Sequence, residues 1–529
     1  MQIFQGTIIT CDADNNVYQY LVEEKGKIVF VGNELPQEYN DCKNIVTLGK
    51  RALVPSFGDG HIHYSNWALI AMEYFDVRTA RNFSDVDEII KTFVKERKGK
   101  IGKALVGFGI SSHCLEEKKL PTKIDLDSYY SEKPMAIVCY DGHSFIANSK
   151  MMEKFPKKVR ESRGFDEETG LLIREAFYLG LDYFTSLFSL ITLIKSIIGA
   201  YDILAQRGIG LIHSVESIGY PMDLDVTMAL MIGKAKSKKN NIQTRMFFQT
   251  MDVSKALKRK LPRIGGCFAT ALDGAFATYD AGLIEPYTNN PESKGILYYS
   301  DDEVADFAKE ANRAELQIEF HTIGDAAVKQ AIDAIEIALQ DYPREDHRHS
   351  IIHVYLISDE DIQRCVNLGI SITAQPAILV SPLEPVWFIE ELIGDRAKTS
   401  SPYRKIIDAG IHLSGGSDGP VTHPDPIAGI YGACNHPYDS SQNLTIQEAL
   451  KMYTYEVAWM SFDEKKRGSL EKGKLADMVI LNENPLSKDP KDLRQLKVEQ
   501  LYLQGKKYKP GMSLGSMLWN AMRARKETI

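Results

Sequence analysis

The stretch ALVPSFGDGHIH, residues 52–63, ends an apolar run with two histidines, His61 and His63, that are separated by one residue. Because side chains alternate along a strand, both imidazoles would lie on the same face and point to one ion. Neutral imidazoles suit Zn²⁺ and related divalent metals. Such a pair alone is more often an accidental pair on a loop, so its meaning depends on what the rest of the chain adds.

Seven further strand-like segments follow, and helical segments separate most of them. The strands begin at Gly208, Ile242, Gly265, Leu316, His349, Ile370 and Ile411, and the helical segments cover residues 301–315, 325–341 and 358–367. This alternation predicts a parallel sheet with right-handed crossovers. Together with the first strand, starting at Ala52, the count of eight favours a closed (β/α)8 barrel.

The two ends of the chain differ from this pattern. They contain short runs in which apolar and polar residues alternate, which is typical of antiparallel strands. We expect residues 1–51 and 467–529 to form one small β-sheet domain, because chain termini often lie close together. The barrel would then cover residues 52–466. Its first two strands are about 150 residues apart, which is too long for a structureless loop and predicts an inserted α/β subdomain at about 65–205.

The composition is that of an ordinary globular protein. The 529 residues are 44% hydrophobic and carry a net charge of -8, which argues against a nucleic-acid partner. The seven cysteines are scattered without a CxxC pair, which fits a reducing compartment. No signal-peptide pattern opens the chain, and the apolar stretch 183–200 carries too many polar residues for a span, so we expect a buried helix, no membrane contact and a cytoplasmic location.

Three more metal-compatible residues fall at predicted strand ends: His321 in strand five, His353 in strand six and Asp418 after strand eight. Active sites of such barrels lie at the carboxyl ends of the strands, so we expect these residues to converge with the first pair. A divalent ion with an open position lowers the pKa of bound water to about 7. We therefore expect metal-bound hydroxide to attack the substrate while Asp418 acts as general base and then general acid.

Several motifs carry a family resemblance that covers nearly the whole chain. The first stretch resembles the first-strand metal motif of the amidohydrolase superfamily. Its YtcJ-like branch, which includes N-substituted formamide deformylases, is similar in DGHSFIANS, GLLIREA, EPYTNNP, HTIGDAAV, ITAQP and GGSDGPV, and the ending GSLEKGKLADMVIL resembles the superfamily's C-terminal sheet. The resemblance implies a metal-dependent hydrolase of non-peptide carbon–nitrogen bonds. It also implies a distorted barrel with a β-sandwich, histidine ligands at 61, 63, 321 and 353, and Asp418 as an acid/base close to the metal.

One position departs from that pattern. Many relatives carry a carboxylated lysine on strand four that bridges two metals, and the corresponding residue here is Ala269. Three alternatives remain open: a single metal, replacement of the lysine by Cys267 or Asp273, which would share the strand face of residue 269, or a ligand from Glu175 in the insertion. We expect one tightly held Zn²⁺ or similar ion, with a weaker second ion as the alternative.

Other residues are candidates for substrate contact. By the resemblance, Asp141 and His143 in YDGHS face the cavity, where His143 would contact the substrate carbonyl; otherwise the motif is a capped turn. Arg174 and Glu175 would bind substrate or form a surface ion pair, and Gln375 would donate a hydrogen bond inward. His347 and His349 lie in the charged stretch EDHRH and are predicted to face solvent.

The expected partner is a small molecule, and a homodimer is the default assembly. The same barrel is compatible with ring C=N deamination and with ester or carbamate hydrolysis. A non-catalytic scaffold would be marked by loss of ligand residues, and all five are present.

Overall fold

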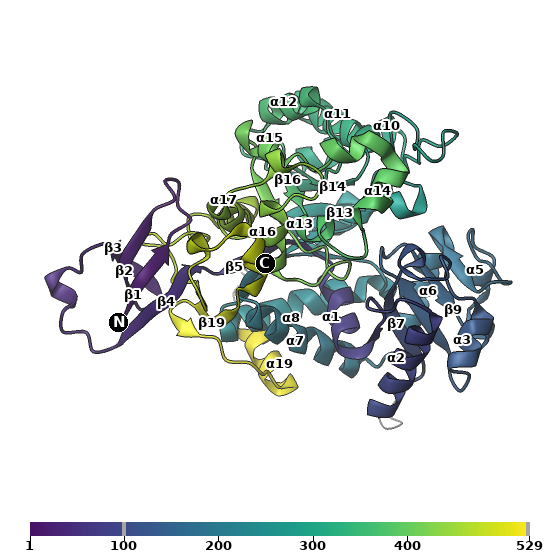
Figure 1. Ribbon diagram of the computed structural model, residues 1–529, viewed down its shortest axis with the longest axis horizontal. Helices are drawn as coiled ribbons and strands as arrows, with labels where there is room; N and C mark the ends of the chain where they lie inside the picture. The colour runs from purple at the N-terminus through teal and green to yellow at the C-terminus, as the bar shows by residue number, and fades with distance from the viewer. Residues whose placement is uncertain (98–101, 525–529) are drawn as a thin grey trace. The chain divides into compact units, whose positions relative to one another are not determined.

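The computed structural model describes residues 1–97 and 102–524 (Figure 1). The chain divides into two compact units. The first consists of Met1–Ile62, Tyr201–Val215 and Leu230–Ile529, and the second of His63–Ala200 and Glu216–Ala229. Two long helices, α7 (Leu190–Gln206) and α8 (Leu224–Asn240), contain boundaries between the units. Each unit has its own sheets and core.

The first unit contains the predicted eight-stranded barrel, nearly closed, in which every pair with a described register is parallel. Its strands, in sheet order from one end to the other, are β17 (Leu413–Gly415), β16 (Ser371–Ala374), β15 (Ser350–His353), β14 (Gln317–Thr322), β13 (Arg263–Ala271), β12 (Gln243–Phe248), β11 (Ile209–Glu216) and β5 (Phe57–Ile62). The expected start of the first strand at Ala52 is wrong. Residues 52–55 belong to the terminal sheet, and the barrel strand begins at Phe57.

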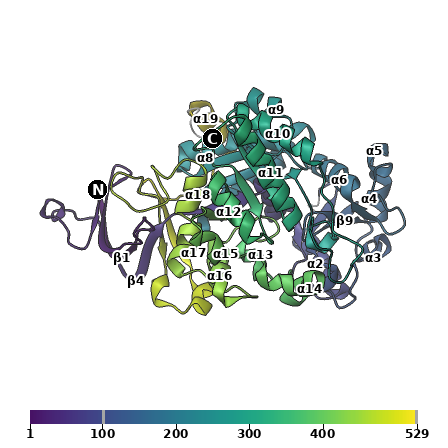
Figure 2. The same ribbon diagram turned by 90° about the horizontal axis from the view of Figure 1, so that it is seen from above.

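Helices connect the barrel strands as the periodicity indicates. The three expected helical segments are α10 (Asp301–Arg313), α11 (Asp325–Asp341) and α12 (Asp359–Leu368). Ser300 begins α10 with a capping box, because its side chain and that of Glu303 each accept a hydrogen bond from the other residue's backbone. α10 and α11 pack against each other and against β14 (Figure 2). The other helices of this unit are α9 (Val253–Arg259), α13 (Pro376–Leu379), α14 (Val386–Ile393), α15 (Tyr403–Asp408), α16 (Pro426–Cys434), α17 (Ile446–Met452), α18 (Tyr455–Met460) and α19 (Leu514–Arg523).

The two chain ends meet in a second sheet of the first unit, where the purple N-terminal strands lie beside the yellow β19 (Figure 1). Its seven strands, in sheet order, are β20 (Lys506–Lys507), β19 (Val498–Leu503), β18 (Met478–Leu481), β4 (Ile45–Pro55), β1 (Gln2–Ile9), β2 (Val17–Glu24) and β3 (Lys27–Gly32). Residues from both ends, including Phe4, Leu53, Met478 and Tyr502, share one apolar core. Burial of that shared apolar surface explains why distant segments form one sheet.

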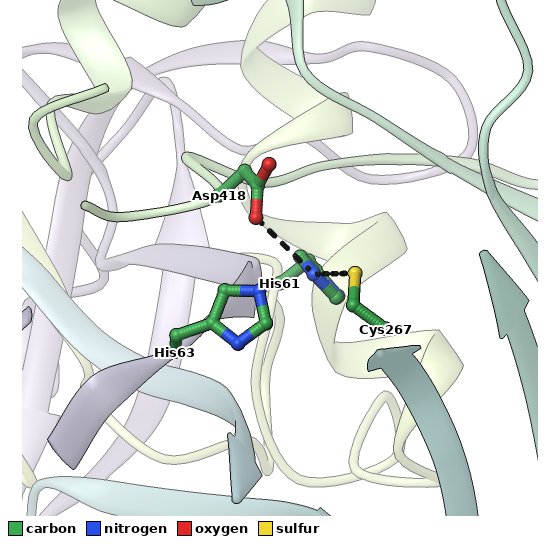
Figure 3. A group of neighbouring side chains, drawn as sticks. All are labelled: His61, His63, Cys267 and Asp418. Carbon is green, nitrogen blue, oxygen red and sulfur yellow. Dashed lines mark hydrogen bonds and ion pairs between the residues drawn. The ribbon is translucent and has the colours of Figure 1, made fainter. Parts of the chain in front are cut away.

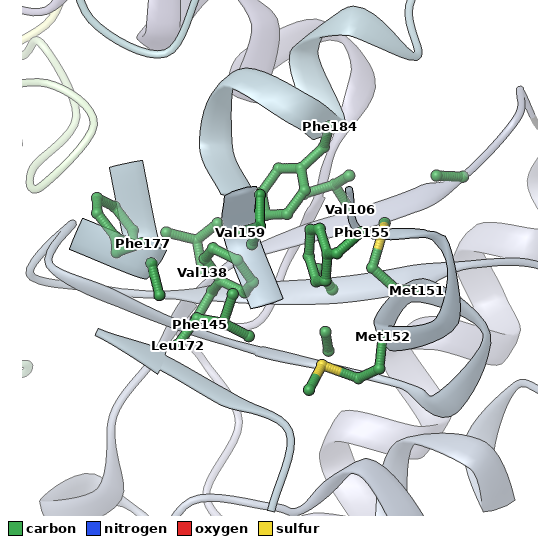
Figure 4. Packing of buried hydrophobic residues seen from close by; sticks show 14 of the residues in the cluster. Val106, Val138, Phe145, Met151, Met152, Phe155, Val159, Leu172, Phe177 and Phe184 are labelled. Atoms are coloured by element: carbon green, nitrogen blue, oxygen red, sulfur yellow. The ribbon is translucent and has the colours of Figure 1, made fainter. Parts of the chain in front are cut away.

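The second unit has its own five-stranded sheet, with the order β10 (Leu171–Ile173), β9 (Ser144–Ala147), β8 (Met135–Cys139), β7 (Leu105–Ile110), β6 (Phe75–Asp76). Aromatic residues dominate the core on one face, where Phe145 contacts Phe184 edge to face at 4.6 Å between ring centroids (Figure 4). The helices are α1 (Tyr64–Glu73), α2 (Phe83–Glu96), α3 (Lys123–Tyr129), α4 (Ser149–Lys154), α5 (Lys157–Arg160) and α6 (Arg174–Ser186).

The apolar stretch 183–200 is not one helix. α6 ends at Ser186 and α7 begins at Leu190, with a bend of 100° between them. Among the described helices, none alone has the length and apolar character to cross a membrane. α6 and α7 meet these two criteria only when the bent pair is taken together.

Candidate metal centre

Six buried side chains form two overlapping groups with the chemistry of metal ligands. The ligand atoms within each group lie within 4.8 Å of one another; the groups are His61, His63, Cys267 and Asp418, and Cys267, His321 and His353. Figure 3 shows the first group, with Asp418 and Cys267 on either side of the His61 ring. Cys267 belongs to both groups, so a single thiol connects all the ligand candidates.

The carboxyl ends of the barrel strands supply these residues. His61 lies in β5, His321 in β14 and His353 at the end of β15, while Asp418 follows β17. The Cys267 sulfur, in β13, lies 3.2 Å from His61 Nε2 and 3.8 Å from His353 Nε2. Asp418 Oδ1 lies 3.5 Å from the same His61 nitrogen. The predicted convergence of strands one, five, six and eight is therefore present in the structure.

An irregularity in β13 places the thiol at this point. Gly266 is paired with Phe320 and Ala271 with the next residue of β14, so Cys267–Thr270 have no partners on that strand. The chain can leave the ladder here because Gly265 and Gly266 have φ angles of 111° and 115°. A Cβ atom at residue 265 would lie 2.0 Å from the carbonyl oxygen of Glu319, so glycine is required there. The bulge turns the side chain of Cys267 toward the histidines.

Because of the same bulge, Asp273 lies outside both ligand groups, contrary to the alternative that it replaces the lysine. Period two places Asp273 on the face of Cys267, but the unpaired residues interrupt that period, and Asp273 belongs to neither ligand group. Its carboxylate instead accepts hydrogen bonds from the backbone N–H groups of Gly282, Ile323 and Gly324 at 2.8–2.9 Å. It thereby fixes the segment that follows β14.

Three of the four histidines in the two groups present their Nδ1 atoms to a buried oxygen. Glu319 Oε2 lies 3.8 Å from His61 Nδ1, and Asp273 Oδ1 lies 3.4 Å from His321 Nδ1. Gln375 Oε1 lies 2.7 Å from His353 Nδ1. The hydrogen bond to Gln375 holds the proton on Nδ1 of His353, and the two nearby carboxylates favour a proton on Nδ1 of His61 and His321. This leaves Nε2 of each ring as the donor to a metal. Gln375, predicted to contact substrate, is thus engaged with a ligand histidine.

Glu319 is not among the residues predicted from the sequence. Its signal is its position two residues before His321, which places both side chains on the same face of β14, and a buried carboxylate needs a partner.

The pKa values of these ligand candidates shift in different directions. Burial raises the pKa of the Cys267 thiol to about 11, and the neighbouring His61 offsets part of this rise. Burial also lowers the pKa of His353 to well below its usual value, and the nearby His321 adds to that effect. Burial would lower the pKa of His61 too, but Cys267 and Asp418 raise it well above the usual value. A metal ion therefore has to displace a proton from His61 and the thiol proton, so acid opposes binding.

Replacing Glu319 with glutamine is expected to weaken Zn²⁺ binding by about 10–100-fold, the usual effect of losing a partner that orients a ligand histidine. The amide lacks the charge that keeps the proton on Nδ1. Competition with a calibrated chelator measures the affinity. Glu456→Gln is a matched control, because Glu456 lies 2.7 Å from Nδ1 of His412, which is outside both ligand groups. Equal affinities of the Glu319 variant and the control would contradict this role.

The donor set fits a divalent transition metal. Imidazole nitrogens, a thiol and a carboxylate are the ligands that Zn²⁺ takes in proteins, and a thiolate favours Zn²⁺ over Mg²⁺ or Ca²⁺. All six donors are buried, with exposed fractions of 7% or less. A buried carboxylate and thiolate are costly without a compensating cation, which a bound metal would supply.

The other candidates lie in the second unit. The backbone N–H of His143 donates to Asp141 Oδ1 at 3.0 Å, which is the capped turn that the alternative interpretation expects. Arg174 and Glu175 begin α6, and both are exposed. The roles of these four residues toward a substrate, and Glu175 as a ligand, stay predictions.

His347 and His349 are buried, contrary to the prediction from their charged neighbourhood. The Nε2 atom of His347 is 2.9 Å from the carbonyl of Leu368, and Nδ1 of His349 accepts the backbone N–H of Ile318 at 3.0 Å. They are structural residues of the barrel, held by main-chain contacts.

Known proteins that resemble this chain cover most of its length. The Bacillus subtilis protein YtcJ, whose name places it among the amidohydrolases, is 26% identical over 87% of this chain and 89% of its own length. The N-substituted formamide deformylase of Arthrobacter pascens is 23% identical over 96% of this chain and 97% of its own. The crystal structure of an uncharacterized metal-dependent hydrolase from Pyrococcus horikoshii shares the fold, with a TM-score of 0.74 and 24% identity over 92% of this chain and 99% of that one.

A sequence profile extends the comparison to a whole family. The profile described as "Amidohydrolase family" matches residues 45–507, which include every ligand candidate of both groups. Because this match covers most of the chain, the protein belongs to the amidohydrolase family.

Proposed function

We propose that this protein is a metal-dependent hydrolase that cleaves a non-peptide, amide-type carbon–nitrogen bond of a small molecule. The observation that supports this proposal most strongly is the convergence of five ligand-type side chains around a sixth, Cys267, at the carboxyl ends of the barrel strands. A bound divalent ion would lower the pKa of water and polarise the substrate carbonyl. Membership of the amidohydrolase family supports the reaction class.

The chain's own contribution to the reaction centres on Asp418. Its carboxylate is 7% exposed and lies beside His61, within the first ligand group. In hydrolysis a carbon–oxygen bond forms, the carbon–nitrogen bond breaks, and a proton passes from water to the departing nitrogen. Asp418 would take that proton on a carboxylate oxygen and deliver it to the leaving group.

The two ligand groups favour a pair of ions over the single tightly held ion that the missing lysine suggests. His61, His63 and Asp418 would hold one ion and His321 and His353 the other, with the thiolate of Cys267 shared. Zn²⁺ is the metal that this set of donors suits best. Cys267 would thus take the place that a carboxylated lysine has in many relatives.

The test is a substrate panel assayed with the zinc-loaded protein. N-substituted formamides come first, because the Arthrobacter pascens relative carries that name. Other amides, ring amidines, esters and carbamates follow, with released amine, ammonia and acid measured separately. We expect release of amine from amides, and loss of that activity when a chelator removes the metal. Ammonia release from a ring would indicate a deaminase, and acid release from an ester or carbamate a hydrolase of those bonds. Activity unaffected by complete metal removal would refute the proposal.

A further inference from the structure

The barrel has a seam between its first and last strands. In the sheet order, β5 and β17 stand at opposite ends of the hydrogen-bonded series, and no ladder between them is described in residues 1–97 and 102–524. Ile62, the last residue of β5, forms an isolated parallel bridge with Gly419, which lies beyond β17, and the backbone N–H of Asp418 donates to the carbonyl of His61 at 2.9 Å. This seam therefore lies between a metal-ligand histidine and the proposed proton carrier.

The carboxylate of Asp59 crosses this seam. It is 2% exposed, and its Oδ1 atom accepts the backbone N–H of Ser417 at 2.9 Å and that of His61 at 3.3 Å. Its Oδ2 atom accepts the hydroxyl of Ser417 at 2.6 Å. One buried side chain thus binds the strand that carries His61 and the segment that carries Asp418. Neither ligand group includes Asp59.

The same contacts surround Asp418 on both sides. Ser417, which precedes it, is held by Asp59, and the Ser417 hydroxyl accepts the backbone N–H of Gly419 at 3.0 Å. Asp418 itself has φ of 51°, in the left-handed region that a residue with a side chain seldom adopts. A residue in such a conformation persists where its surroundings hold it, and the Asp59–Ser417 pair does so here.

We propose that Asp59 is a positioning residue, which holds the carboxylate of Asp418 at a fixed place beside His61 by closing the barrel seam through Ser417. The proposal rests on the proposed function, since the catalytic task of Asp418 belongs to it. Asp59 acts through hydrogen bonds to Ser417 and the backbone, so its loss displaces Asp418 and leaves the other five ligand candidates in place. A displacement of about 1 Å at a reacting group is enough to lower a rate by about 100-fold.

The experiment compares Asp59→Asn and the milder Ser417→Ala with wild type in zinc-loaded and Co²⁺-loaded protein. We expect kcat to fall by about 100-fold in the Asp59 variant, with KM and metal per chain within about twofold. The visible bands of Co²⁺ should shift, because Asp418 is a ligand candidate and the Asp59–Ser417 pair holds it in place. Asp477→Asn is the matched control: a 4% exposed aspartate that accepts the backbone N–H of Gln504 at 2.7 Å, in the terminal sheet. Its kcat and spectrum should match wild type.

A cycle with Asp418→Asn separates positioning from a general structural role. If Asp59 acts through Asp418, adding Asp59→Asn to the Asp418 variant leaves both the residual turnover and the Co²⁺ spectrum unchanged. Further loss of the same size in that background, or a fall in metal content that matches the fall in rate, would overturn the inference. The Co²⁺ spectrum tests whether Asp59 positions Asp418 even if no panel substrate is hydrolysed. Absence of hydrolysis would refute the proposed function but not the positioning role.

Discussion

Asp418→Asn is expected to lower kcat by about 10²–10⁴-fold, the range that positioned general acid–base catalysis contributes. The amide keeps the size and a carbonyl oxygen of the carboxylate but no longer takes up a proton. Steady-state kinetics on the best panel substrate measures the loss. Elemental analysis should show metal content close to wild type, because five other donors of the two groups remain.

Two comparisons make this result specific. Asp361→Asn is a control, because Asp361 is an 8% exposed aspartate in α12 that accepts the hydroxyl of Ser358 at 2.8 Å. This control variant should retain kcat. Full activity of Asp418→Asn would refute the proton-carrying role, whereas loss of metal together with activity would make Asp418 a ligand first and a proton carrier second.

Cys267→Ala is expected to lower the bound metal from about two ions per chain to about one or none, since a shared thiolate contributes to both sites. Activity should fall with the metal. Elemental analysis of zinc-loaded protein measures the stoichiometry, and in Co²⁺-loaded wild type a sulfur-to-metal charge-transfer band should report the thiolate. That band should be absent from the variant.

A buried cysteine elsewhere in the barrel unit is the control. Cys365, in α12, is fully buried and belongs to neither ligand group, so Cys365→Ala should keep both the metal content and the charge-transfer band. One ion per chain in wild type and an unchanged value in Cys267→Ala would support the single-ion alternative and exclude the thiolate as a ligand.

The fold was predictable because its signals are local. Apolar runs of five to nine residues that alternate with amphipathic helices predict a parallel barrel, and α11 begins and ends at the expected residues, Asp325 and Asp341. The start of the first strand was less predictable. Residues 52–58 form one mostly apolar run, and only pairing with β18 or β11 decides which part joins which sheet.

The ligand histidines were predictable for a related reason. Parallel strands of a barrel end at a common rim, so histidines at the ends of several strands lie close together. The same reasoning did not show which residue replaces the missing lysine. The choice between Cys267 and Asp273 depended on the alternation of side chains along β13, which the bulge at Cys267–Thr270 interrupts. That bulge depends on how Gly265 packs against β14.

The amino-acid sequence by itself determined the barrel, the sheet built from both chain ends, and the strand-end positions of the four histidines and Asp418. Strand and helix periodicity and strand-end position are properties of short segments. Only the tertiary structure decided that Cys267, 206 residues beyond His61, lies 3.2 Å from it, and that Glu319 and Asp59 support the donors. Those contacts cross the barrel or its seam, and their geometry follows from the closure of eight strands around a common axis, which no single segment encodes.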